Sequence, residues 1–437
     1  MTTRLLSLCI IAIASVLSAG AAQPVVANRQ TAGNYYAYPY PEKPLPVLTP
    51  APGGYEPYHM EHYGRHGSRW HIGEWVYREP INLLRSAERN GKLTPRGKEL
   101  LAQMRKIEMD SRGRDGELTQ LGAVQHRGIA RRMTANFPEI FGADARIDAR
   151  STDVVRCILS MDNELQEFKA FNPRLEVTSD GSKSAVCYLN FHDNVAAGKY
   201  EAVKKKSLES IAGATRPDYA AFASQLVDDP VFVADSIDAK ALFESMFRIA
   251  ANAQSHYDQV APYDLFTDSQ LHNKWVYDNA DWFLRFGNTA LTEGAGPMTQ
   301  RYLLRNWIES ADTAVMNARP SANMRFGHEV ALLPFVVLLD LDGLGREIND
   351  LSRLENEWRN YEIFPMASNI QMIFYRPTGR EYTPGDVLVK VLLNEREVTL
   401  PATPVDGPYY RWSDLRDLYL SRLGSDGGKL PEQQPYY

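Results

Sequence analysis

The sequence predicts an α/β fold in which a mainly helical domain is inserted between two parts of an α/β core. Three observations lead to this prediction. An aromatic and apolar segment that ends near Gly64 is typical of a strand entering a tight turn. Helical patterns then fill residues 172–320, and strand patterns return in residues 321–437. We therefore expect residues 57–171 and 321–437 to form the first and second parts of one core domain.

Length and composition indicate an ordinary globular protein. The chain has 437 residues, of which 44% are hydrophobic and 23% are charged, enough for a sizeable core and more than one domain. Its formal net charge is −6. A nucleic-acid partner is disfavoured, because the chain has no basic excess to neutralise a phosphate backbone. An anionic small substrate must instead be attracted by a local cationic pocket.

Residues 1–22 have the organisation of a secretory signal peptide. Arg4 precedes an apolar run at residues 5–17, and small residues follow at 18–22. The alternative is a membrane anchor, but the run is shorter than the ~20 apolar residues that span a bilayer. We expect a mature protein that is exported to the periplasm or the extracellular space and that has no membrane span.

Residues 23–56 are rich in Pro, Gly and Tyr and have neither helical nor strand periodicity. We interpret them as an extended N-terminal arm that lies on the body through its aromatic rings, with a flexible exported linker as the alternative. Only Cys157 and Cys187 remain after removal of the leader. An oxidising compartment would allow these cysteines to pair, but both could equally be small buried apolar residues.

The first part of the core is predicted to alternate helices with one further strand. Thr94 and Thr119 stand where they can cap the helices that follow them, and Pro95 suits a first helical position. Ser151 or Thr152 is expected to cap a helix that runs to about residue 171. The predicted helices cover residues 72–90, 95 onward, 120–136 and 152–171, and the predicted strand covers residues 145–149.

Residues 172–320 are predicted to form a helical cap domain, which commonly shapes substrate choice by overhanging the reaction centre. Thr267 and Gln270 resemble a capping box at the start of an amphipathic helix. Trp275, Trp282 and Phe283 have helical spacing and are expected in the core rather than at a ligand. The predicted helices cover residues 196–212, 218–226, 239–259, 267–286 and 296–317.

The second part of the core is predicted to begin with a strand at residues 323–326 and a buried apolar helix at residues 330–339. Residues 369–375 and 387–394 are typical of two paired strands. Ser413 is expected to cap a last helix that ends near residue 423.

Residues 58–69 carry the pattern with the clearest chemical meaning. Two arginines and a histidine surround a glycine directly after the predicted strand, so several cationic donors would point at one place. Guanidinium groups hydrogen-bond phosphate oxygens in pairs, which makes a phosphate dianion the fitting ligand. His66 would lie beside the phosphorus as a nucleophile, and Gly67 would let the backbone turn without crowding the anion.

Four segments carry a resemblance to a known family. Residues 65–69 (RHGSR) match the RHGxR motif of the histidine acid phosphatases, and residues 325–334 (RFGHEVALLP) resemble the second catalytic motif of that family. Residues 118–122 (LTQLG) and 150–156 (RSTDVVR) resemble two further family segments that lie between these motifs. Residues 264–267 (DLFT), with the aromatic helix after them, suggest the multiple inositol polyphosphate phosphatase branch, which includes phytases.

The resemblance implies a fold, a reaction and a set of roles. The fold would be a phosphoglycerate-mutase-like three-layer α/β/α sandwich with an inserted helical cap. His66 would attack phosphorus to form a phosphohistidine, and Glu329 would protonate the departing oxygen. The phosphoryl oxygens would be held by Arg65, Arg69, Arg156 and His328. No cofactor or metal is implied, and the partner would be a small phosphate ester.

One residue departs from the family pattern. Family members usually have Asp directly after the second His, and the inositol polyphosphate branch often has His-Ala-Glu, whereas this chain has His328 and Glu329. The acid is one methylene longer than Asp at the same position. Two alternatives to an inositol polyphosphate phosphatase therefore stay open: a histidine acid phosphatase of broad specificity, and a non-catalytic phosphate-binding surface protein.

The histidines of residues 58–69 also invite a metal site. His59 and His62 would face opposite ways on a strand, however, and no His pair with helical spacing accompanies a carboxylate. Ser68 lacks the Gly-x-Ser-x-Gly context of a nucleophilic serine. The remaining histidines are predicted to be surface or hydrogen-bonded core residues: His71, His126, His192, His256 and His272.

Overall fold

The computed structural model describes residues 28–39, 44–142, 144–191, 198–214, 216–317 and 319–429. The predicted signal peptide at residues 1–22 and His192 lie outside these ranges. Among the helices of the described ranges, none is long and apolar enough to cross a membrane.

A central mixed sheet forms the core, in the strand order β3-β2-β4-β1-β5-β6-β7, with β8 paired to β6. The first four strands of this order run parallel, and β5 joins β1 antiparallel. The antiparallel pairing of β5 with β6 confirms the predicted strand pair. The strands are β1 (Tyr55–Arg65), β2 (Arg146–Ser151), β3 (Glu176–Asp180), β4 (Ser321–Gly327), β5 (Asn369–Pro377), β6 (Leu388–Leu393), β7 (Arg396–Glu397) and β8 (Tyr410–Arg411).

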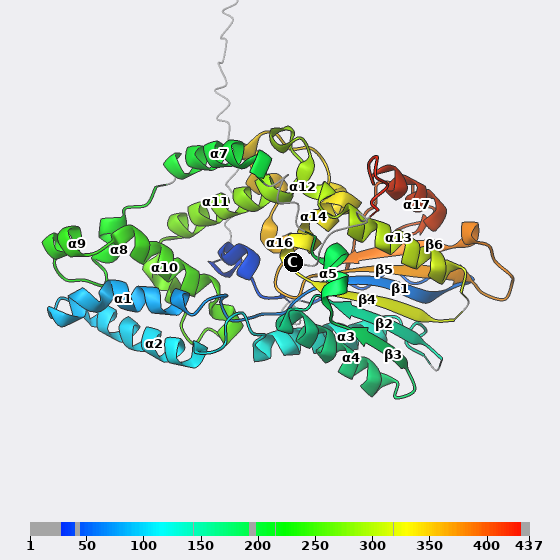
Figure 1. The fold of residues 1–437 in the computed structure, drawn as a ribbon, viewed down its shortest axis with the longest axis horizontal. Coiled ribbons are helices and arrows are strands. Elements are labelled where there is room, and N and C mark those ends of the chain that lie inside the picture. The colour runs from blue at the N-terminus through cyan, green and yellow to red at the C-terminus, as the bar shows by residue number, and fades with distance from the viewer. Residues whose placement is uncertain are drawn as a thin grey trace, which may run out of the picture.

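Helices cover both faces of the sheet, as the predicted α/β sandwich requires (Figure 1). Met60 and Met324 face the side of α3 (Gln120–Asn136) and α4 (Val155–Phe171). Tyr63 and Phe374 face the other side, which is covered by α5 (Lys183–Leu189), α13 (Arg301–Val315), α14 (Glu329–Leu339) and α17 (Trp412–Ser421). Alternate residues of β1 therefore enter two separate hydrophobic clusters.

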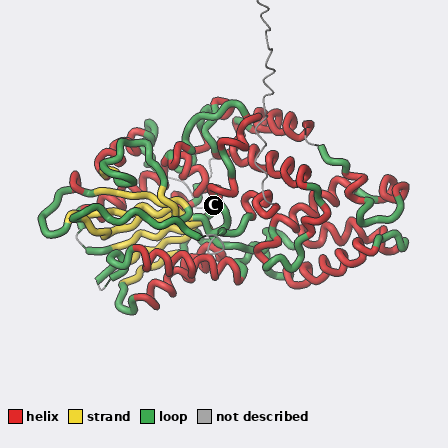
Figure 2. The backbone as a smooth tube through the Cα atoms, turned by 180° about the vertical axis from the view of Figure 1, so that it is seen from behind, coloured by secondary structure: helices red, strands yellow, loops and turns green. Residues whose placement is uncertain are grey.

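Beside the sheet lies a body made of helices alone, which Figure 2 shows at the end away from the yellow strands. Its hydrophobic cluster joins helices that precede the predicted cap domain, which starts at residue 172, with helices that follow residue 172. Trp275 is buried in this cluster and Phe283 in the cluster on the α14 side of the sheet, as predicted, and Trp282 is partly buried against the latter cluster. The helices here are α1 (Trp75–Arg89), α2 (Pro95–Ser111), α8 (Tyr219–Ala223), α9 (Pro230–Ser236), α10 (Ala239–Ala251) and α11 (Asp268–Phe286). The helices α7 (Glu201–Ala214), α12 (Ala295–Met298), α15 (Leu354–Glu357) and α16 (Asn360–Ile363) complete the chain's α-helices in the described ranges.

The sequence predicted the N-cap residues correctly where the cap side chain bonds a backbone N–H in the first turn of its own helix. Thr94 and Thr119 accept hydrogen bonds from the backbone N–H of Gly97 and Gly122, and Thr267 forms the predicted capping box with Gln270. The prediction for Ser151 or Thr152 is wrong, because the hydroxyl of Ser151 bonds the Thr152 carbonyl and Val154 occupies the cap position. Ser413 also lies inside α17, one residue after its start.

Two segments have structure that the sequence pattern did not predict. The edge strand β3 falls within the mainly helical residues 172–320, and its short, mostly exposed run has no alternating apolar pattern. Residues 28–35 form a 3-10 helix, η1, after which Tyr36 and Tyr38 are buried against the body. Residues 36–38 of the arm are thus packed on the body through their aromatic rings, whereas residues 44–54 are exposed or only partly buried.

Candidate active site

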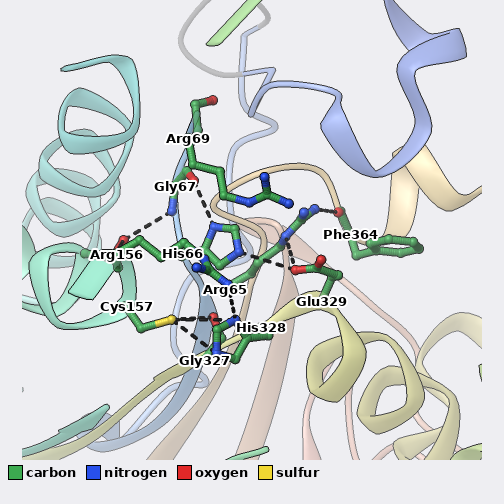
Figure 3. Close-up of polar contacts among 12 residues, drawn as sticks. Arg65, His66, Gly67, Arg69, Arg156, Cys157, Gly327, His328, Glu329 and Phe364 are labelled. Atoms are coloured by element: carbon green, nitrogen blue, oxygen red, sulfur yellow. Dashed lines mark hydrogen bonds and ion pairs between the residues drawn. The ribbon is translucent and has the colours of Figure 1, made fainter. Parts of the chain in front are cut away.

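Two sequence motifs that are far apart in the chain meet at the ends of neighbouring strands. Arg65 is the last residue of β1 and is paired in register with Gly327, the last residue of β4. The His66 N–H donates to the Gly327 carbonyl at 3.0 Å. His328 then caps α14, whose first residue is Glu329. The sheet thereby brings both motifs to one place, where α14 also points its N-terminus (Figure 3).

The His66 imidazole is fully buried and is held in one tautomer. Its Nδ1 lies 3.0 Å from the Gly67 carbonyl oxygen, which can only accept, so Nδ1 carries the hydrogen. The Nε2 atom has no hydrogen-bond partner among the described residues. Burial, together with the charges of Arg156 and Arg65, holds the pKa of His66 well below its usual range, although Glu329 opposes this. His66 is therefore neutral with a free lone pair on Nε2.

Three arginines place donors without partners around the same space. Arg65 is fully buried and donates from Nη1 to the Phe364 carbonyl at 2.6 Å. Within the described residues, Nη2 of Arg65, Nε of Arg69 and Nε of Arg156 are buried donors without a hydrogen-bond partner. Burial lowers the pKa of Arg65 to about 10, so it stays charged at neutral pH. Such unpaired cationic donors fit an oxyanion.

Glu329 is the carboxylate that faces this cluster. Its Oε2 lies 3.2 Å from Nε of Arg65 and 3.4 Å from Nε2 of His66. Burial by itself raises the pKa of Glu329, but the positive charge of Arg65, together with that of Arg69, holds that pKa well below its usual range. The longer side chain therefore reaches the imidazole, and its carboxyl group is ionised when the site holds no other anion.

His328 lies between the helix α4 and the strand ends. An arginine can only donate, so Nη2 of Arg156 donates to Nδ1 of His328 at 3.3 Å. Nε2 of His328 then carries the hydrogen and donates to the Thr152 hydroxyl at 3.2 Å. Burial, reinforced by Arg156, lowers the pKa of His328 to about 4. All six predicted site residues are thus brought together, and His328 orients Arg156.

The turn after His66 is fixed by residues that the sequence did not single out. The Ser68 N–H donates to the Gln125 side chain at 2.9 Å, and the Gln125 amide donates back to the Ser68 hydroxyl at 3.0 Å. The Gly67 N–H donates to the Ser160 hydroxyl at 3.1 Å. Gln125 lies one turn into the helix that residues 118–122 begin, and nothing in the pattern marked Ser160.

A second backbone segment, residues 364–368, holds the other side of the turn. The Arg65 N–H donates to the Ser368 carbonyl at 2.8 Å, and the Ala367 N–H donates to the His66 carbonyl at 3.0 Å. Ala367 has a φ of 60°, in the left-handed region that favours glycine. The backbone on both sides of the histidine is therefore anchored before any ligand arrives.

The site contains groups that could hold a metal ion, since ligand atoms of His66, His328 and Glu329 lie within 4.8 Å of one another. Three guanidinium groups border the same space, however, and would repel a cation. The donor set fits an anion better than a metal.

Of the other residues named from the sequence, Cys157 borders this cluster, since its Sγ lies 3.6 Å from Nε2 of His328, whereas Arg150, His126 and His272 have partners elsewhere. Arg150 pairs with Asp148 at 3.2 Å. Cys157 is a buried free thiol that donates to the Gly327 carbonyl, and Cys187 is also free. His126 is buried and paired with Glu164 at 2.7 Å, and His272 is paired with Glu355 at 2.9 Å.

The sequence and the fold resemble those of known proteins. The sequence model described as histidine phosphatase superfamily (branch 2) matches residues 65–394. No curated protein sequence matches the chain. The Bifidobacterium longum multiple inositol polyphosphate phosphatase, solved in complex with inositol hexasulfate, is 19% identical with a TM-score of 0.72, covering 90% of this chain and 98% of its own.

Two phytase structures are also similar. The D. castellii phytase is 15% identical with a TM-score of 0.61, covering 91% of this chain and 86% of its own. The Hafnia alvei phytase in complex with myo-inositol hexakis sulphate is 11% identical with a TM-score of 0.53, covering 87% of this chain and 100% of its own. Identities this low show a shared fold, and the predicted histidine phosphatase fold is confirmed.

The contact between the His66 turn and α3 predicts an effect of Gly122→Ala. A methyl group on Gly122 would meet the carbonyl oxygen of Ser68 and lie 2.9 Å from its nitrogen, so helix and turn must separate. We expect a loss of ~1–3 kcal/mol in unfolding free energy, as for other overpacked sites, and loss of inorganic phosphate binding by calorimetry. Gly128→Ala on the same helix is the control, since its methyl group would meet only the Arg132 guanidinium, 3.0 Å from Nη1, and not the His66 turn. Equal phosphate affinity in both variants would contradict the prediction.

Proposed function

The chain belongs to the histidine phosphatase superfamily (branch 2) and is a phosphomonoesterase, and we propose that it hydrolyses inositol polyphosphates such as phytate after export from the cell. The observation that carries this proposal is the convergence of Arg65, Arg69 and Arg156 on the free Nε2 of His66. The substrate class is supported by the inositol-phosphatase and phytase neighbours. Export is supported by the organisation of residues 1–22.

The first half of the reaction transfers the phosphoryl group to His66. The lone pair on Nε2 attacks phosphorus, a P–N bond forms, and the bond between phosphorus and the inositol oxygen breaks. Guanidinium groups of Arg65, Arg69 and Arg156 hold the three non-bridging oxygens, and His328 orients Arg156 by accepting a hydrogen bond from it. The departing alkoxide takes a proton from Glu329, whose carboxyl lies 3.4 Å from Nε2.

Glu329 must gain that proton after substrate binds. Its pKa is held low chiefly because the arginine charges outweigh burial. A bound phosphate group neutralises those charges, so the pKa of the carboxyl rises. A phosphate monoester with a second pKa near ~6 enters as a monoanion at acidic pH and can deliver the proton itself.

The second half of the reaction releases phosphate. Water attacks phosphorus, Glu329 accepts the proton from that water, and the P–N bond breaks to return neutral His66. The arginines hold the same oxygens in both halves, so no further cation is needed for charge stabilisation.

A test of this function is phosphate release from phytate by the wild type and by His66→Ala. We expect the variant to lose activity by at least ~10⁴-fold, since removal of a nucleophile abolishes the covalent route. Wild-type enzyme quenched in base during turnover should carry one phosphoryl group by intact mass, and the variant none. His272→Ala, which changes a histidine paired with Glu355 outside the cluster, is the control. Phosphate binding by a wild type that releases none would favour the non-catalytic alternative.

The role of Glu329 predicts a dependence on the leaving group. Glu329→Gln should lower kcat for phytate by ~10²–10⁴-fold, the range for a lost general acid, because an alkoxide leaves poorly without a proton. The loss should be much smaller for p-nitrophenyl phosphate, whose phenolate leaves unprotonated. Glu329→Asp keeps a carboxyl group and should retain part of the phytase activity. The assignment is wrong if Glu329→Gln hydrolyses both substrates at the wild-type rate.

The pKa directions predict the pH profile of kcat/KM, which reports the free enzyme. Burial lowers the pKa of His66 well below its usual value, so the nucleophile stays unprotonated as the pH falls through 6. His328 becomes protonated only when the pH falls to its pKa of about 4. Activity on an alkyl phosphate should therefore persist at pH 5 and fall on the acid side only at or below about pH 4. An acid limb with a midpoint near ~6.5, the ordinary histidine value, would contradict the buried neutral imidazole.

A further inference from the structure

A tyrosine from the N-terminal arm lies against the arginine cluster. Tyr35 ends η1, and its ring lies 5.2 Å from the central carbon of the Arg69 guanidinium. The same ring packs against the His71 ring at 4.9 Å. Tyr35 is only partly buried, so part of its surface faces the outside of the pocket. Figure 1 shows η1, in dark blue, between the helical body and the sheet.

The arm is fixed relative to the catalytic turn by one short backbone segment. The Met366 N–H donates to the Tyr36 carbonyl at 2.8 Å, and the Ala367 N–H donates to the His66 carbonyl at 3.0 Å. Two consecutive residues therefore hold the neighbour of Tyr35 and the proposed nucleophile. The Ala37 N–H also donates to the Gln254 side chain of the helical body at 3.2 Å. These bonds set the position of Tyr35 above the pocket without any ligand.

The phenol group also lies within electrostatic reach of the other pocket arginines. Burial is the main cause that lowers the pKa of Arg65 and of Arg156, and both guanidinium groups additionally interact with the Tyr35 phenol. The three guanidiniums come from the end of β1, the turn after it and the start of α4. The Tyr35 side chain therefore borders the same cluster as the three guanidinium groups.

We propose that Tyr35 is a positioning and specificity-determining residue, which fixes Arg69 with its ring and binds a second phosphate group of a polyphosphorylated substrate with its hydroxyl. This inference rests on the proposed function. Stacking covers one face of the Arg69 guanidinium and leaves its edge, where the N–H groups lie, free for a phosphate oxygen. The phenol hydroxyl is a hydrogen-bond donor and can bond an anionic oxygen beside the reacting group. A monoester without a second phosphate has nothing there to accept that bond.

Two variants distinguish the role of the Tyr35 hydroxyl from that of its ring: Tyr35→Phe removes the hydroxyl alone, and Tyr35→Ala removes the ring as well. Tyr36→Phe is the matched control. Tyr36 is the next residue, and its ring packs against that of Tyr361 with the ring centroids 6.2 Å apart. For Tyr35→Phe we expect the KM for phytate to rise ~10-fold, the effect of one hydrogen bond to a charged group, with kcat nearly unchanged. Its KM for p-nitrophenyl phosphate should equal that of the wild type. Tyr36→Phe should leave the ratio of the two KM values unchanged.

Tyr35→Ala should additionally weaken the binding of inorganic phosphate ~3–10-fold by calorimetry, the effect of a lost cation–π contact, whereas Tyr35→Phe should bind it like the wild type. Unchanged phosphate affinity in Tyr35→Ala would overturn the role of the ring. An equal shift of both KM values in Tyr35→Phe, or none, would overturn the role of the hydroxyl, as would a wild type that hydrolyses p-nitrophenyl phosphate but not phytate. A wild type that releases no phosphate from any ester defeats the proposed function, while the calorimetry still tests the ring.

Discussion

Uncompensated positive charge in one buried pocket is the constraint on which the rest of this site depends. Arg65, Arg69 and Arg156 come from three segments and border the same space, where Glu329 is the acidic side chain in contact with the cluster. Bringing these charges out of water and next to one another is costly unless an anion joins them. Hydrogen bonds from Arg65 to the Phe364 carbonyl and from Arg69 to the Trp70 carbonyl offset part of that cost. The remaining donors have the geometry of a receptor for phosphate.

The same charges keep the imidazole and the carboxyl group in the states that the proposed reaction needs at its start. A buried histidine next to cations is neutral, and a buried carboxyl next to cations is ionised. The protonation state of each group is therefore set by the charges around it rather than by the ordinary pKa of its side chain. Neutralisation of the arginines by a bound phosphate reverses the balance at Glu329, so arrival of the substrate itself prepares the proton donor.

Rigidity of the pocket comes from parallel pairing of β1 with β4 and from the segment at residues 364–368. The sheet register sets where the two motifs meet, and the segment binds the backbone at Arg65 and at His66. The arm that carries Tyr35 is tied to the same segment. The sheet, the His66 turn and the arm are thus joined by one set of backbone hydrogen bonds, which fixes their relative positions.

The amino-acid sequence by itself determined the elements whose causes are local. The caps at Thr94, Thr119 and Thr267 are satisfied within one helical turn, and the apolar run of α14 marks a buried helix wherever it lies. The two motifs could be recognised because their chemistry is written in adjacent residues. Tertiary structure alone decided the side-chain partner of Thr152, the support of the turn by Gln125 and Ser160, and the place of Tyr35. Those contacts join residues with no periodic or spacing relation, and a hydroxyl or a ring takes whichever partner the packing of distant segments brings within reach.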